Sequence, residues 1–379
     1  MSLPAAPRRV LLLRAIDELS TVITGEAMHH ALQALPDAGL RYDLFRRPRR
    51  RLPGRFNFRV GRQPLTSEAL NDYYARLLYY PLAARRQRAE IYHITDDRYG
   101  AVVRWLDPRR CVVSVNHGTP EIFRDELRVG TGMLFRVQRY VFNAIRQAAY
   151  ILTASRVMRD HILEHYPLAP ERVVVNPYGY DACYGPGTDA QRAEARAHYG
   201  WPAERFVLLH VGNLGPTKNI ETLLRALPLL PERVHFVQAG GAWAPAHQRL
   251  IAEHALGSRV QALGRVPELT PLYHGADAFV FPSLMEGFGL PLLEAMAAGL
   301  PAVTSNFGTM AEVAGQGALT VDPRDPAALA AAVRGLLDEP GQRQHWRAAG
   351  LRRAQDFSWR RHAETLRDLY LAVDARNPR

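Results

Sequence analysis

A buried strand, a glycine-bearing loop and a helix follow one another in the stretch Phe281-Pro-Ser-Leu-Met-Glu-Gly-Phe-Gly-Leu-Pro-Leu-Leu-Glu294. Pro291 predicts the first turn of the helix, because the N–H that proline lacks would have no partner there. Gly299 and Pro301 predict where the helix ends. The loop at 287–289 leaves backbone amides free at the mouth of the helix, where anionic groups bind. The stretch therefore predicts one strand–helix unit of an α/β fold with an anion site in its loop.

The same alternation of strands and helices runs along both halves of the chain. In the first half, strands are predicted at residues 10–13, 42–45, 91–94, 111–115, 150–153 and 173–175, and helices at 25–35, 67–88, 133–148 and 155–166. In the second half, strands are predicted at 206–211, 234–239, 260–263, 278–281, 302–304 and 319–321, and helices at 220–226, 246–254, 270–275, 291–298, 327–338 and 342–354. Ser155 follows a strand and predicts the N-cap of its helix. Alternating strands and helices predict parallel sheets covered by helices on both faces.

Length and composition indicate an ordinary two-domain globular protein. The chain has 379 residues, and a domain usually has roughly 100–200. Residues 176–187 are rich in Pro, Gly, Asp and Tyr and predict a linker. We expect domains at 1–181 and 182–358 and a separate amphipathic segment at 359–379. The hydrophobic content of 47% and charged content of 22% exclude a disordered or fibrous chain.

The sequence predicts a cytoplasmic location. No apolar run approaches the ~18 residues that a membrane-spanning helix needs. The run at 10–13 is shorter than the about 7–15 residues of a signal-peptide core. Cys111 and Cys183 belong to no CxxC or metal-type cluster, so a reducing compartment without disulfides is expected.

The positive charge of the chain comes almost entirely from arginine. The net charge is +11, and Lys218 is the single lysine among 48 basic side chains. A compositional bias toward arginine explains the rest. The exception suggests that position 218 needs a compact ammonium group rather than a planar guanidinium.

A strongly basic stretch runs from Arg46 to Arg62. Its arginines are Arg46, Arg47, Arg49, Arg50, Arg51, Arg55, Arg59 and Arg62. It is either a solvated loop or a contact with an anionic membrane or a phosphate-bearing acceptor. Nucleic acid is disfavoured, because no nucleic-acid-binding motif or stacking pattern of aromatic residues accompanies the charge.

A second anion site is predicted in the segment His210-Val-Gly-Asn-Leu-Gly-Pro-Thr-Lys-Asn219. Gly212 and Gly215 permit close approach of the backbone to a ligand, and Lys218 lies at the mouth of the next helix. The alternative is a tight turn with a surface lysine. The P-loop pattern is absent.

Glu286 and Glu294 are candidate ligands for sugar hydroxyls. A carboxylate accepts hydrogen bonds from vicinal diols. The alternative for each is a charge that the helix dipole favours near the helix start. Leu293 and Ala295 flank Glu294 in an apolar helix, which disfavours a merely solvated role.

These motifs resemble glycosyltransferase family 4, the retaining enzymes of the glycosyltransferase B fold. The resemblance covers about residues 206–370 and is strongest in Glu-Gly-Phe-Gly-Leu-Pro-Leu-Leu-Glu-Ala-Met-Ala-Ala-Gly-Leu-Pro. Within the family, the chain is similar to a bacterial mannosyltransferase-like branch that builds surface polysaccharides. The resemblance implies two Rossmann-like domains facing a cleft, with the acceptor on the first, the nucleotide sugar on the second, and a C-terminal helix that crosses back to the first.

The resemblance also implies roles for individual residues. Glu286 would bind the hydroxyls of the donor sugar, Lys218 the diphosphate and Glu294 the ribose diol. In the first half, Gly25 would approach the phosphate from a glycine-bearing loop, and His117 would lie beside the transferred sugar. The implied catalytic residues are His117, Lys218 and Glu286. The implied donor-binding residues are Gly25, Gly212, Asn213, Lys218, Arg265, Val266, Glu286, Gly287, Phe288, Gly289, Leu290 and Glu294.

Three positions depart from the family pattern. Asn213 stands where members commonly have arginine, so one phosphate charge is missing. Gly118 follows His117 where the branch usually has aspartate, and Tyr178 stands where asparagine is usual. For His117 the alternative is a structural histidine at a strand end.

We therefore expect a retaining, metal-independent transfer of a hexose from a nucleotide diphosphate sugar to a glycan or lipid-linked acceptor. No Asp-x-Asp metal motif is present, and no cofactor is expected. The alternatives are a nucleotide-sugar-binding subunit without activity, a nucleotide-sugar epimerase, and a dinucleotide-dependent oxidoreductase. The last is disfavoured, because the GxGxxG fingerprint after the first strand is missing.

Overall fold

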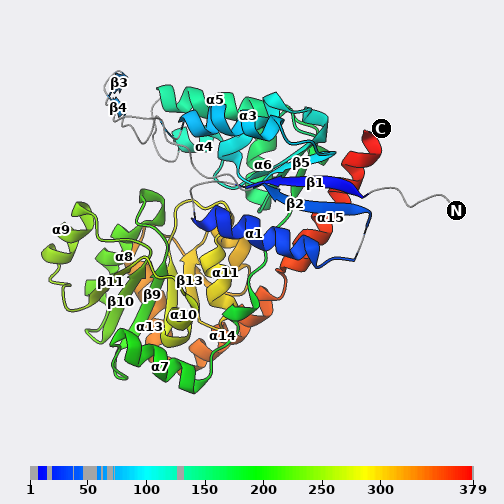
Figure 1. Cartoon of the computed structure of the whole chain (residues 1–379). Coiled ribbons are helices and arrows are strands. Elements are labelled where there is room, and N and C mark those ends of the chain that lie inside the picture. The colour runs from blue at the N-terminus through cyan, green and yellow to red at the C-terminus, as the bar shows by residue number, and fades with distance from the viewer. Residues whose placement is uncertain are drawn as a thin grey trace. The chain divides into compact units, whose positions relative to one another are not determined.

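The chain forms two compact units, each built on a six-stranded parallel sheet flanked by helices (Figure 1). The computed structural model describes residues 7–14, 19–36, 38–45, 58–60, 63–65, 71, 73–125 and 132–377. Unit 1 contains Met1–Pro177 and Trp359–Arg379, and unit 2 contains Tyr178–Ser358. The units divide four residues earlier than the expected boundary at 181/182. The predicted α/β fold class is confirmed.

The sheet of unit 1 has the strand order β2-β1-β5-β6-β7-β8. Its strands are β1 (Arg8–Leu13), β2 (Leu40–Phe45), β5 (Ile91–Ile94), β6 (Cys111–Val115), β7 (Tyr150–Thr153) and β8 (Val173–Val175). The order changes direction between β1 and β5, which is where open α/β sheets bind ligands. An antiparallel hairpin that was not predicted, β3 (Phe58–Val60) and β4 (Gln63–Leu65), forms a separate small sheet.

The helical segments of unit 1 are α1 (Leu19–Gln33), η1 (Ala75–Tyr79), α3 (Tyr80–Arg85), η2 (Asp97–Trp105), η3 (Pro108–Arg110), α4 (Pro120–Asp125), α5 (Met133–Ile145), α6 (Arg156–His165), η4 (Pro170–Arg172) and α15 (Trp359–Arg376). Ser155 caps α6 as predicted, because its hydroxyl accepts a hydrogen bond of 3.2 Å from the Met158 amide.

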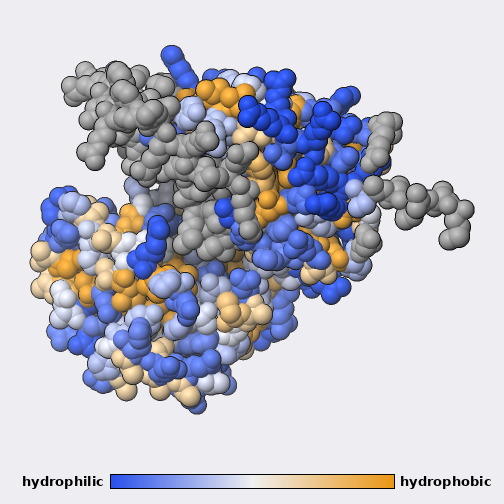
Figure 2. All heavy atoms as spheres, in the orientation of Figure 1, coloured by the Kyte–Doolittle hydropathy of each residue, from blue (hydrophilic) through white to orange (hydrophobic). Residues whose placement is uncertain are grey.

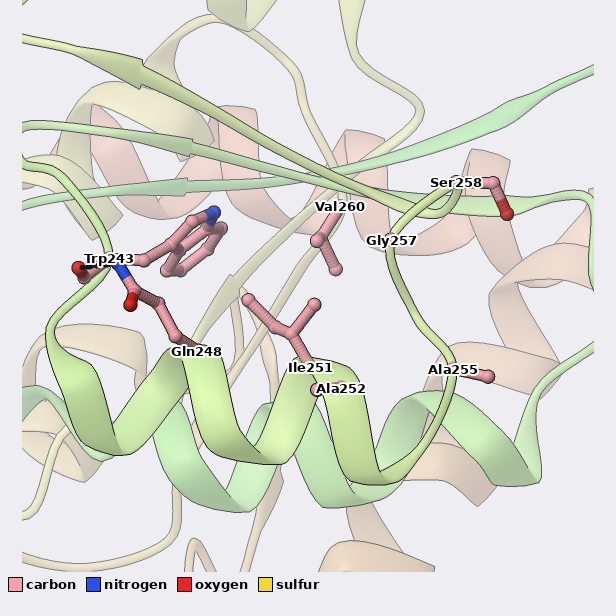
Figure 3. A pocket seen from close by; sticks show the side chains of 8 residues that line it. All are labelled: Trp243, Gln248, Ile251, Ala252, Ala255, Gly257, Ser258 and Val260. Atoms are coloured by element: carbon pink, nitrogen blue, oxygen red, sulfur yellow. Dashed lines mark hydrogen bonds between the residues drawn. The ribbon is translucent and has the colours of Figure 1, made fainter.

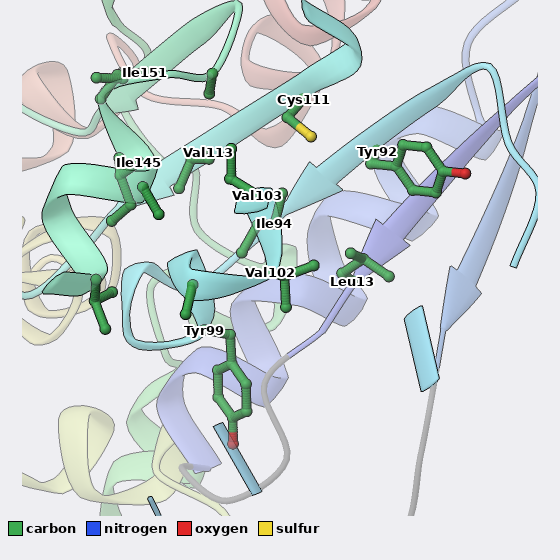
Figure 4. Packing of buried hydrophobic residues seen from close by; sticks show 14 of the residues in the cluster. Leu13, Tyr92, Ile94, Tyr99, Val102, Val103, Cys111, Val113, Ile145 and Ile151 are labelled. Carbon is green, nitrogen blue, oxygen red and sulfur yellow. The ribbon is translucent and has the colours of Figure 1, made fainter. Parts of the chain in front are cut away.

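Strand and helix side chains form one apolar core in unit 1. Ile94, Val113 and Ile151, from three neighbouring strands, pack with Val103 of η2 and Ile145 of α5 (Figure 4). All five are at most 1% exposed. Burying such a side chain contributes about 1.5–3 kcal/mol, so this cluster fixes the loops that follow the strands.

The helix predicted over 67–88 is interrupted within the part of it that the structure describes. A π-helical turn, η1, precedes α3, and the Tyr80 amide donates to the Ala75 carbonyl. Pro81 has no N–H for the carbonyl of Leu77, four residues before it, so regular α-helical pairing cannot continue there. The wider turn is the result.

The C-terminal helix α15 packs against α1 and β5 of unit 1, as the predicted crossing-back helix should. The Tyr370 hydroxyl lies 2.7 Å from Nδ1 of buried His93. At the start of α15, the Asn176 side-chain amide donates to the His362 carbonyl at 3.1 Å. These contacts fasten the end of the chain to the first half.

The sheet of unit 2 has the strand order β11-β10-β9-β12-β13-β14. Its strands are β9 (Phe206–Val211), β10 (Val234–Ala239), β11 (Val260–Gly264), β12 (Ala278–Phe281), β13 (Ala302–Ser305) and β14 (Leu319–Val321). The order changes direction between β9 and β12, so a ligand is expected where these two strands end.

The helical segments of unit 2 are η5 (Ala182–Tyr184), α7 (Asp189–Tyr199), η6 (Pro216–Lys218), α8 (Ile220–Ala226), η7 (Leu227–Leu229), α9 (Pro245–Glu253), α10 (Thr270–Gly275), α11 (Leu290–Ala297), α12 (Gly308–Ala314), α13 (Pro326–Asp338) and α14 (Pro340–Ala354). Among the residues that the structure describes, no helix is both long and apolar enough to span a bilayer. The basic stretch from Arg46 to Arg62 lies outside the described residues, apart from the backbone of β3, so its membrane contact stays a prediction.

Candidate functional site

Two loops at the switch point of the unit 2 sheet carry the predicted anion site. Residues 212–219 follow β9, and residues 282–289 follow the neighbouring strand β12. A hydrogen bond of 2.7 Å from the Leu284 amide to the Thr217 carbonyl ties the loops together. The loops therefore form one surface at the carboxyl ends of β9 and β12.

Close packing fixes the backbone at the start of the first loop. The Gly212 amide donates to the Ala239 carbonyl at 2.8 Å, and the Gln238 side chain donates to the Gly212 carbonyl at 2.7 Å. Gly240 has φ 124°, and a Cβ there would lie 2.2 Å from the Gly212 oxygen. Only glycine fits position 240. Exposed Asn213 projects from this fixed turn.

Asn219 positions the end of the first loop. It adopts the left-handed conformation (φ 55°). Its side-chain amide donates to the carbonyls of Pro282 and Pro323 at 3.1 and 2.6 Å. Its Oδ1 accepts from the Thr222 hydroxyl at 2.7 Å. These bonds hold Lys218 at the mouth of α8.

Lys218 and Glu286 form a direct ion pair, in which the Lys218 Nζ donates to Glu286 Oε1. Their side chains are only 14% and 13% exposed. Nζ also lies 5.2 Å from the centre of the Phe281 ring, within cation–π range. An ammonium has three N–H donors, so the pair leaves donors for an anionic ligand. The sequence suggested Lys218 and Glu286 separately, and the structure shows that their side chains form one ion pair.

His210 packs behind this ion pair, and the sequence analysis gave it no role. The ring is fully buried and stacks on Phe281, with centroids 5.3 Å apart. Burial, assisted by the positive charge of Lys218, lowers the His210 pKa to about 3. The imidazole is therefore neutral at physiological pH and adds no second cation.

The start of α11 requires a glycine. Gly289 has φ 103°, and a Cβ there would lie 2.2 Å from Cε of Met310 on α12. The backbone conformation disfavours any residue other than glycine, and a Cβ would also require the Met310 side chain to shift. Pro291 has no N–H, and the amides of Leu292 and Leu293 donate to the Gly289 carbonyl at 3.0 and 3.2 Å, so the backbone amides that can meet an anion are those of residues 287–290.

The residues around Gly289 also lie where the sequence predicted. Phe288 is buried, and its ring meets Tyr178 and Phe357 edge-on at 5.5 and 5.6 Å. Gly287 and Leu290 are half-buried. The Phe288 ring thus anchors the loop while its backbone stays at the helix mouth.

Glu294 lies one turn inside α11 and is hydrogen-bonded to a tyrosine. The Tyr273 hydroxyl donates to Glu294 Oε2 at 2.7 Å. Burial raises the Glu294 pKa from 4.5 to about 7; the Tyr273 hydrogen bond opposes the rise, and Asp181 adds to it. Near neutral pH the carboxyl group therefore exchanges its proton readily, and hydroxyl donors from a ligand would favour its ionised form. The sequence pointed to Glu294 but not to Tyr273.

Arg265 and Val266 follow the carboxyl end of β11, an edge strand of the unit 2 sheet. They follow β11, whose last residue, Gly264, accepts a hydrogen bond of 2.7 Å from the Gly240 amide. Arg265 is exposed and Val266 half-buried. The strand order places them two strands from β9, roughly 10 Å along the sheet. They are therefore not part of the Lys218 cluster.

In unit 1, His117 is hydrogen-bonded to Asp97. His117 Nδ1 lies 2.9 Å from Asp97 Oδ1, and the same oxygen accepts from the amides of Asn116 and His117 at 2.8 and 3.2 Å. A carboxylate only accepts, so Nδ1 carries the proton. In the neutral ring, Nε2 is then the acceptor nitrogen. The sequence analysis missed Asp97, although it directly follows a predicted strand.

Asp96 and Arg98 support this histidine from behind. Arg98 donates to both carboxyl oxygens of Asp96, at 3.0 and 2.6 Å. Burial acts to raise the Asp96 pKa, but His117 and Arg98 outweigh it and lower the pKa to about 2. Asp96 is therefore ionised and adds negative charge near the His117 ring.

Gly25 is not in a loop, so that part of the prediction is wrong. It lies in the second turn of α1, and a Cβ there would lie 3.1 Å from Cγ of Arg14 and 3.6 Å from Oγ1 of Thr95. The helix begins six residues earlier than expected. Gly25 thus allows α1 to pack closely against the loops after β1 and β5.

Among the described residues, two groups of side chains lie close enough to share a metal ion: Asp96, Asp97 and His117, and His161, Glu164 and His165. In the first group, Arg98 and backbone amides already occupy the carboxylate oxygens. In the second, His161 Nε2 lies 2.7 Å from the Thr119 hydroxyl. Hydrogen bonds thus engage several of the ligand atoms in each group.

A hollow of about 540 Å³ beside α9 lies apart from the predicted residues (Figure 3). Its lining consists of Trp243, Gln248, Ile251, Ala252, Ala255, Gly257, Ser258 and Val260. None of these side chains is charged or titratable. The hollow therefore offers no group for acid–base or anion chemistry.

The fold is shared with solved glycosyltransferase structures. Sucrose-phosphate synthase from Thermosynechococcus elongatus superposes with a TM-score of 0.79 at 22% identity, covering 98% of this chain and 100% of the other. HepE from Anabaena, solved in complex with UDP and glucose, has a TM-score of 0.74 at 16% identity, covering 96% and 99%. At these identities the likeness establishes the fold.

Curated relatives match part of the chain. O-antigen chain mannosyltransferase B of Escherichia coli is 32% identical over 231 residues, which are 59% of this chain and 60% of the relative. Glycogen synthase of Mycobacterium tuberculosis is 37% identical over 238 residues, covering 60% and 55%. The chain thus spans little more than half the length of these relatives.

Two family descriptions together account for most of the chain. Residues 25–182 match Glycosyltransferase Family 4, and residues 191–353 match Glycosyl transferases group 1. Each match falls almost entirely within one structural unit. Since the fold, the site loops and both halves of the sequence agree, the chain belongs to glycosyltransferase family 4.

Proposed function

We propose that this chain transfers a hexose, of mannose or glucose type, from a nucleotide diphosphate sugar to a glycan or lipid-linked acceptor. The observation that carries the proposal is that the Lys218–Glu286 pair and the loop 287–290 at the mouth of α11 lie at one switch point. A positive charge beside a helix N-terminus suits a diphosphate. HepE, which shares the fold, has been solved with UDP-glucose.

Each part of the unit 2 site takes one part of the donor. Lys218 and the amides near Gly289 face the diphosphate, and Glu286 accepts hydrogen bonds from sugar hydroxyls. Glu294, one turn further along α11, accepts from the ribose diol. The base edge lies against the backbone of Arg265 and Val266, with Gly212 and Asn213 shaping the turn beneath the phosphates. Backbone contacts of this kind suit guanine and uracil alike.

The proposed reaction retains the anomeric configuration and uses no metal. The bond between the sugar C1 and the phosphate oxygen breaks, and a bond from C1 to the acceptor oxygen forms on the same face. The acceptor proton passes to the departing phosphate oxygen. Lys218 and the backbone amides of residues 287–290 stabilise the negative charge that develops on the phosphate, which is the largest contribution such a site makes.

In unit 1, we assign to His117 the role of contacting the transferred sugar and the acceptor hydroxyl. The Asp97 bond favours the tautomer with the proton on Nδ1, so Nε2 is the acceptor nitrogen of the neutral ring. The O-antigen relative supports a role in surface polysaccharide or glycoconjugate synthesis. The same proposal places the protein peripherally at the inner face of the cell membrane, with the basic stretch at 46–62 on anionic lipid. It does not include binding of nucleic acid.

Thermal shift against GDP, UDP and their sugar conjugates tests the donor assignment. A ligand at 100 times its Kd stabilises by about 2.7 kcal/mol, which for a unit of this size is roughly 5–11 °C. If no GDP or UDP compound raises the Tm, the proposal fails.

Turnover separates an enzyme from a binding subunit. Release of nucleoside diphosphate from the sugar nucleotide that binds should fall at least about 100-fold in Lys218→Met, since one donor to a developing charge is lost. Arg225→Met, which removes an exposed cation from the neighbouring helix α8, is the matched control and should behave as the intact chain. Binding without release of diphosphate, or interconversion of the sugar without release, contradicts the proposed transfer.

A further inference from the structure

A buried tyrosine, Tyr273 of α10, contacts Glu294, the carboxyl group that we assign to the ribose. Tyr273 is 1% exposed, so it adds almost nothing to the surface, on whose visible face hydrophilic and apolar side chains are mixed (Figure 2). Its hydroxyl donates to Glu294 Oε2 at 2.7 Å, whereas the Pro291 carbonyl is farther away, at 3.5 Å. A hydroxyl has one proton to donate, so Glu294 is its partner. A residue this deeply buried acts on a ligand through Glu294 rather than by direct contact.

Neighbouring side chains hold the Tyr273 ring from two sides. The ring of Tyr184, from η5, meets it edge-on at 5.7 Å between centroids, and Phe279 of β12 packs at a tilt at 5.8 Å. The end of α10 is fixed as well, because Arg192 of α7 donates to the Ala276 carbonyl at 2.6 Å. All of these residues belong to unit 2. The hydroxyl therefore has a fixed position from which it can orient a partner.

One oxygen of Glu294 remains available to a ligand. Oε2 accepts from the Tyr273 hydroxyl, but no residue in the described part of the chain donates to Oε1. The side chain is half-buried, so a ligand can reach it. The last torsion of a glutamate side chain is soft, and the bond to Oε2 restrains it. Oε1 therefore has one preferred orientation before a ligand arrives.

We propose that Tyr273 is a positioning residue for the donor: by holding one oxygen of Glu294, it presents the other to the ribose diol and makes the site prefer ribonucleotides to deoxyribonucleotides. The inference rests on the proposed function, in which Glu294 accepts from that diol. Ordering an unrestrained side chain on binding weakens affinity roughly 2- to 10-fold, and a carboxyl group that is already held avoids this loss. Only the contact with the ribose hydroxyls gains, so a ligand without them should not respond to Tyr273.

The same hydrogen bond influences the charge of Glu294. Burial raises the Glu294 pKa to about 7, the Tyr273 bond opposes the rise, and the negative charge of Asp181 adds to it. Tyr184 also lies near this carboxyl group, and burial and the Glu294 charge raise its pKa, so it stays neutral near pH 7. Burial likewise raises the pKa of Tyr273, which therefore remains a hydrogen-bond donor. Loss of the Tyr273 hydroxyl should raise the Glu294 pKa further.

Deoxynucleotides test the inference on the full chain. Calorimetry near neutral pH gives the affinities for UDP and GDP and for their 2′-deoxy and 3′-deoxy forms, and the ratio of ribo to deoxy affinity measures the diol contact. In the intact chain this ratio should be about 10 or more, as expected for a hydrogen bond to a charged group. Tyr273→Phe keeps the ring, removes the hydroxyl and should lower the ratio about 3- to 10-fold. An unchanged ratio in Tyr273→Phe overturns the inference.

Two control variants separate positioning from packing. Tyr199, on α7, is a half-buried tyrosine whose hydroxyl bonds no residue that the structure describes, so Tyr199→Phe should keep the ratio of the intact chain. Glu294→Ala should abolish the preference, and Tyr273→Phe added to it should change nothing more. A further fall in the double variant would mean that Tyr273 does not act through Glu294. Both affinities come from one preparation, so partial unfolding of a variant cancels in the ratio.

The pH profile of the ratio would not move if Tyr273 only packed. An ionised carboxylate is the stronger acceptor, so the ribose preference of the intact chain should grow as the pH rises through about 7. Tyr273→Phe removes a bond that lowers the Glu294 pKa, so its preference should appear only at higher pH. Coincident profiles of the two chains would contradict the inference.

Nucleotide binding separates the inference from the proposed function. If neither UDP nor GDP binds, the proposed function fails first. If both the intact chain and Tyr273→Phe prefer ribonucleotides equally, the inference alone is wrong. If the intact chain binds nucleotides without such a preference, Glu294 does not hold the ribose, and the inference fails with that assignment while the transferase function stands.

Discussion

Replacing Glu294 by Gln should stabilise unit 2 in a pH-dependent way. The Glu294 carboxyl has its pKa raised by burial from 4.5 to about 7. As the pH rises from 4.5 to 7, the unfolded chain loses this proton while the folded chain keeps it, so the free energy of unfolding falls; above about 7 the loss is complete. The shift of about 2.5 units corresponds to about 3 kcal/mol.

Glutamine removes this loss while it keeps the local structure. Its side-chain oxygen accepts from the Tyr273 hydroxyl as the carboxylate does, and it carries no charge at any pH. Near pH 4.5 the variant and the intact chain should therefore have the same stability. At pH 8 Glu294→Gln should be more stable by about 3 kcal/mol, roughly 6–12 °C in Tm for a unit of this size.

The measurement is the Tm between pH 4.5 and 8.5, followed in the transition that a bound nucleotide shifts. Glu253→Gln, at an exposed position on α9, controls for the loss of one negative charge and should show no such trend. A difference between Glu294→Gln and the intact chain that is the same at pH 4.5 and pH 8 would refute the reasoning. It would mean that the Glu294 pKa is not raised by burial.

The same substitution separates stability from binding. If Glu294 holds the ribose diol, Glu294→Gln should bind nucleotide more weakly while it unfolds less readily at pH 8. A buried carboxyl retained at such a loss of stability is typical of a functional position. The two effects have opposite signs, so general damage to the fold cannot produce both.

Three further outcomes follow from the geometry. Gly289→Ala should destabilise unit 2 by about 1–3 kcal/mol in urea unfolding, because it forces a residue with a Cβ into the left-handed region and makes the Met310 side chain shift; unchanged stability would contradict the strain at position 289. Asp97→Asn should lower kcat and change its pH profile with little change in the donor KM, because the His117 tautomer is no longer fixed; an unchanged profile would make Asp97 merely structural. Dialysis against EDTA should leave turnover within about twofold, since a preorganised cation and helix amides serve in place of a metal; loss of activity that Mg²⁺ or Mn²⁺ restores would contradict a metal-independent reaction.

Local signals in the sequence were sufficient for the strands of the two parallel sheets, for most of the longer helices and for single residues of the site. The loop before Pro291 forms as predicted, because glycine and proline preferences act over a few neighbouring residues. The helix α7 was missed, although Thr188 and Gln191 form a capping box at its start. That signal is equally local, and the interpretation of the neighbouring residues as a linker concealed it.

Contacts between distant residues could not be read from the sequence. Lys218 and Glu286 are 68 positions apart and meet only because β9 and β12 are neighbours in the sheet. The bond from His117 to Asp97 likewise depends on the pairing of β5 with β6. Strand order is a property of the whole fold. Motifs and spacing along the chain therefore indicate which residues belong to a site, but not which of them contact one another.

The charges around the unit 2 site explain why one lysine can suffice. Lys218 is balanced by Glu286, the His210 ring is neutral, and Glu294 is partly protonated near pH 7. Before ligand arrives, the site is therefore close to neutral and avoids the desolvation of an unpaired buried cation. A diphosphate that enters must draw its stabilisation from the remaining N–H donors of Lys218 and from the backbone amides of residues 287–290. Asn213 adds no charge, so these backbone dipoles stabilise negative charge on the diphosphate that a second cation would otherwise help to stabilise.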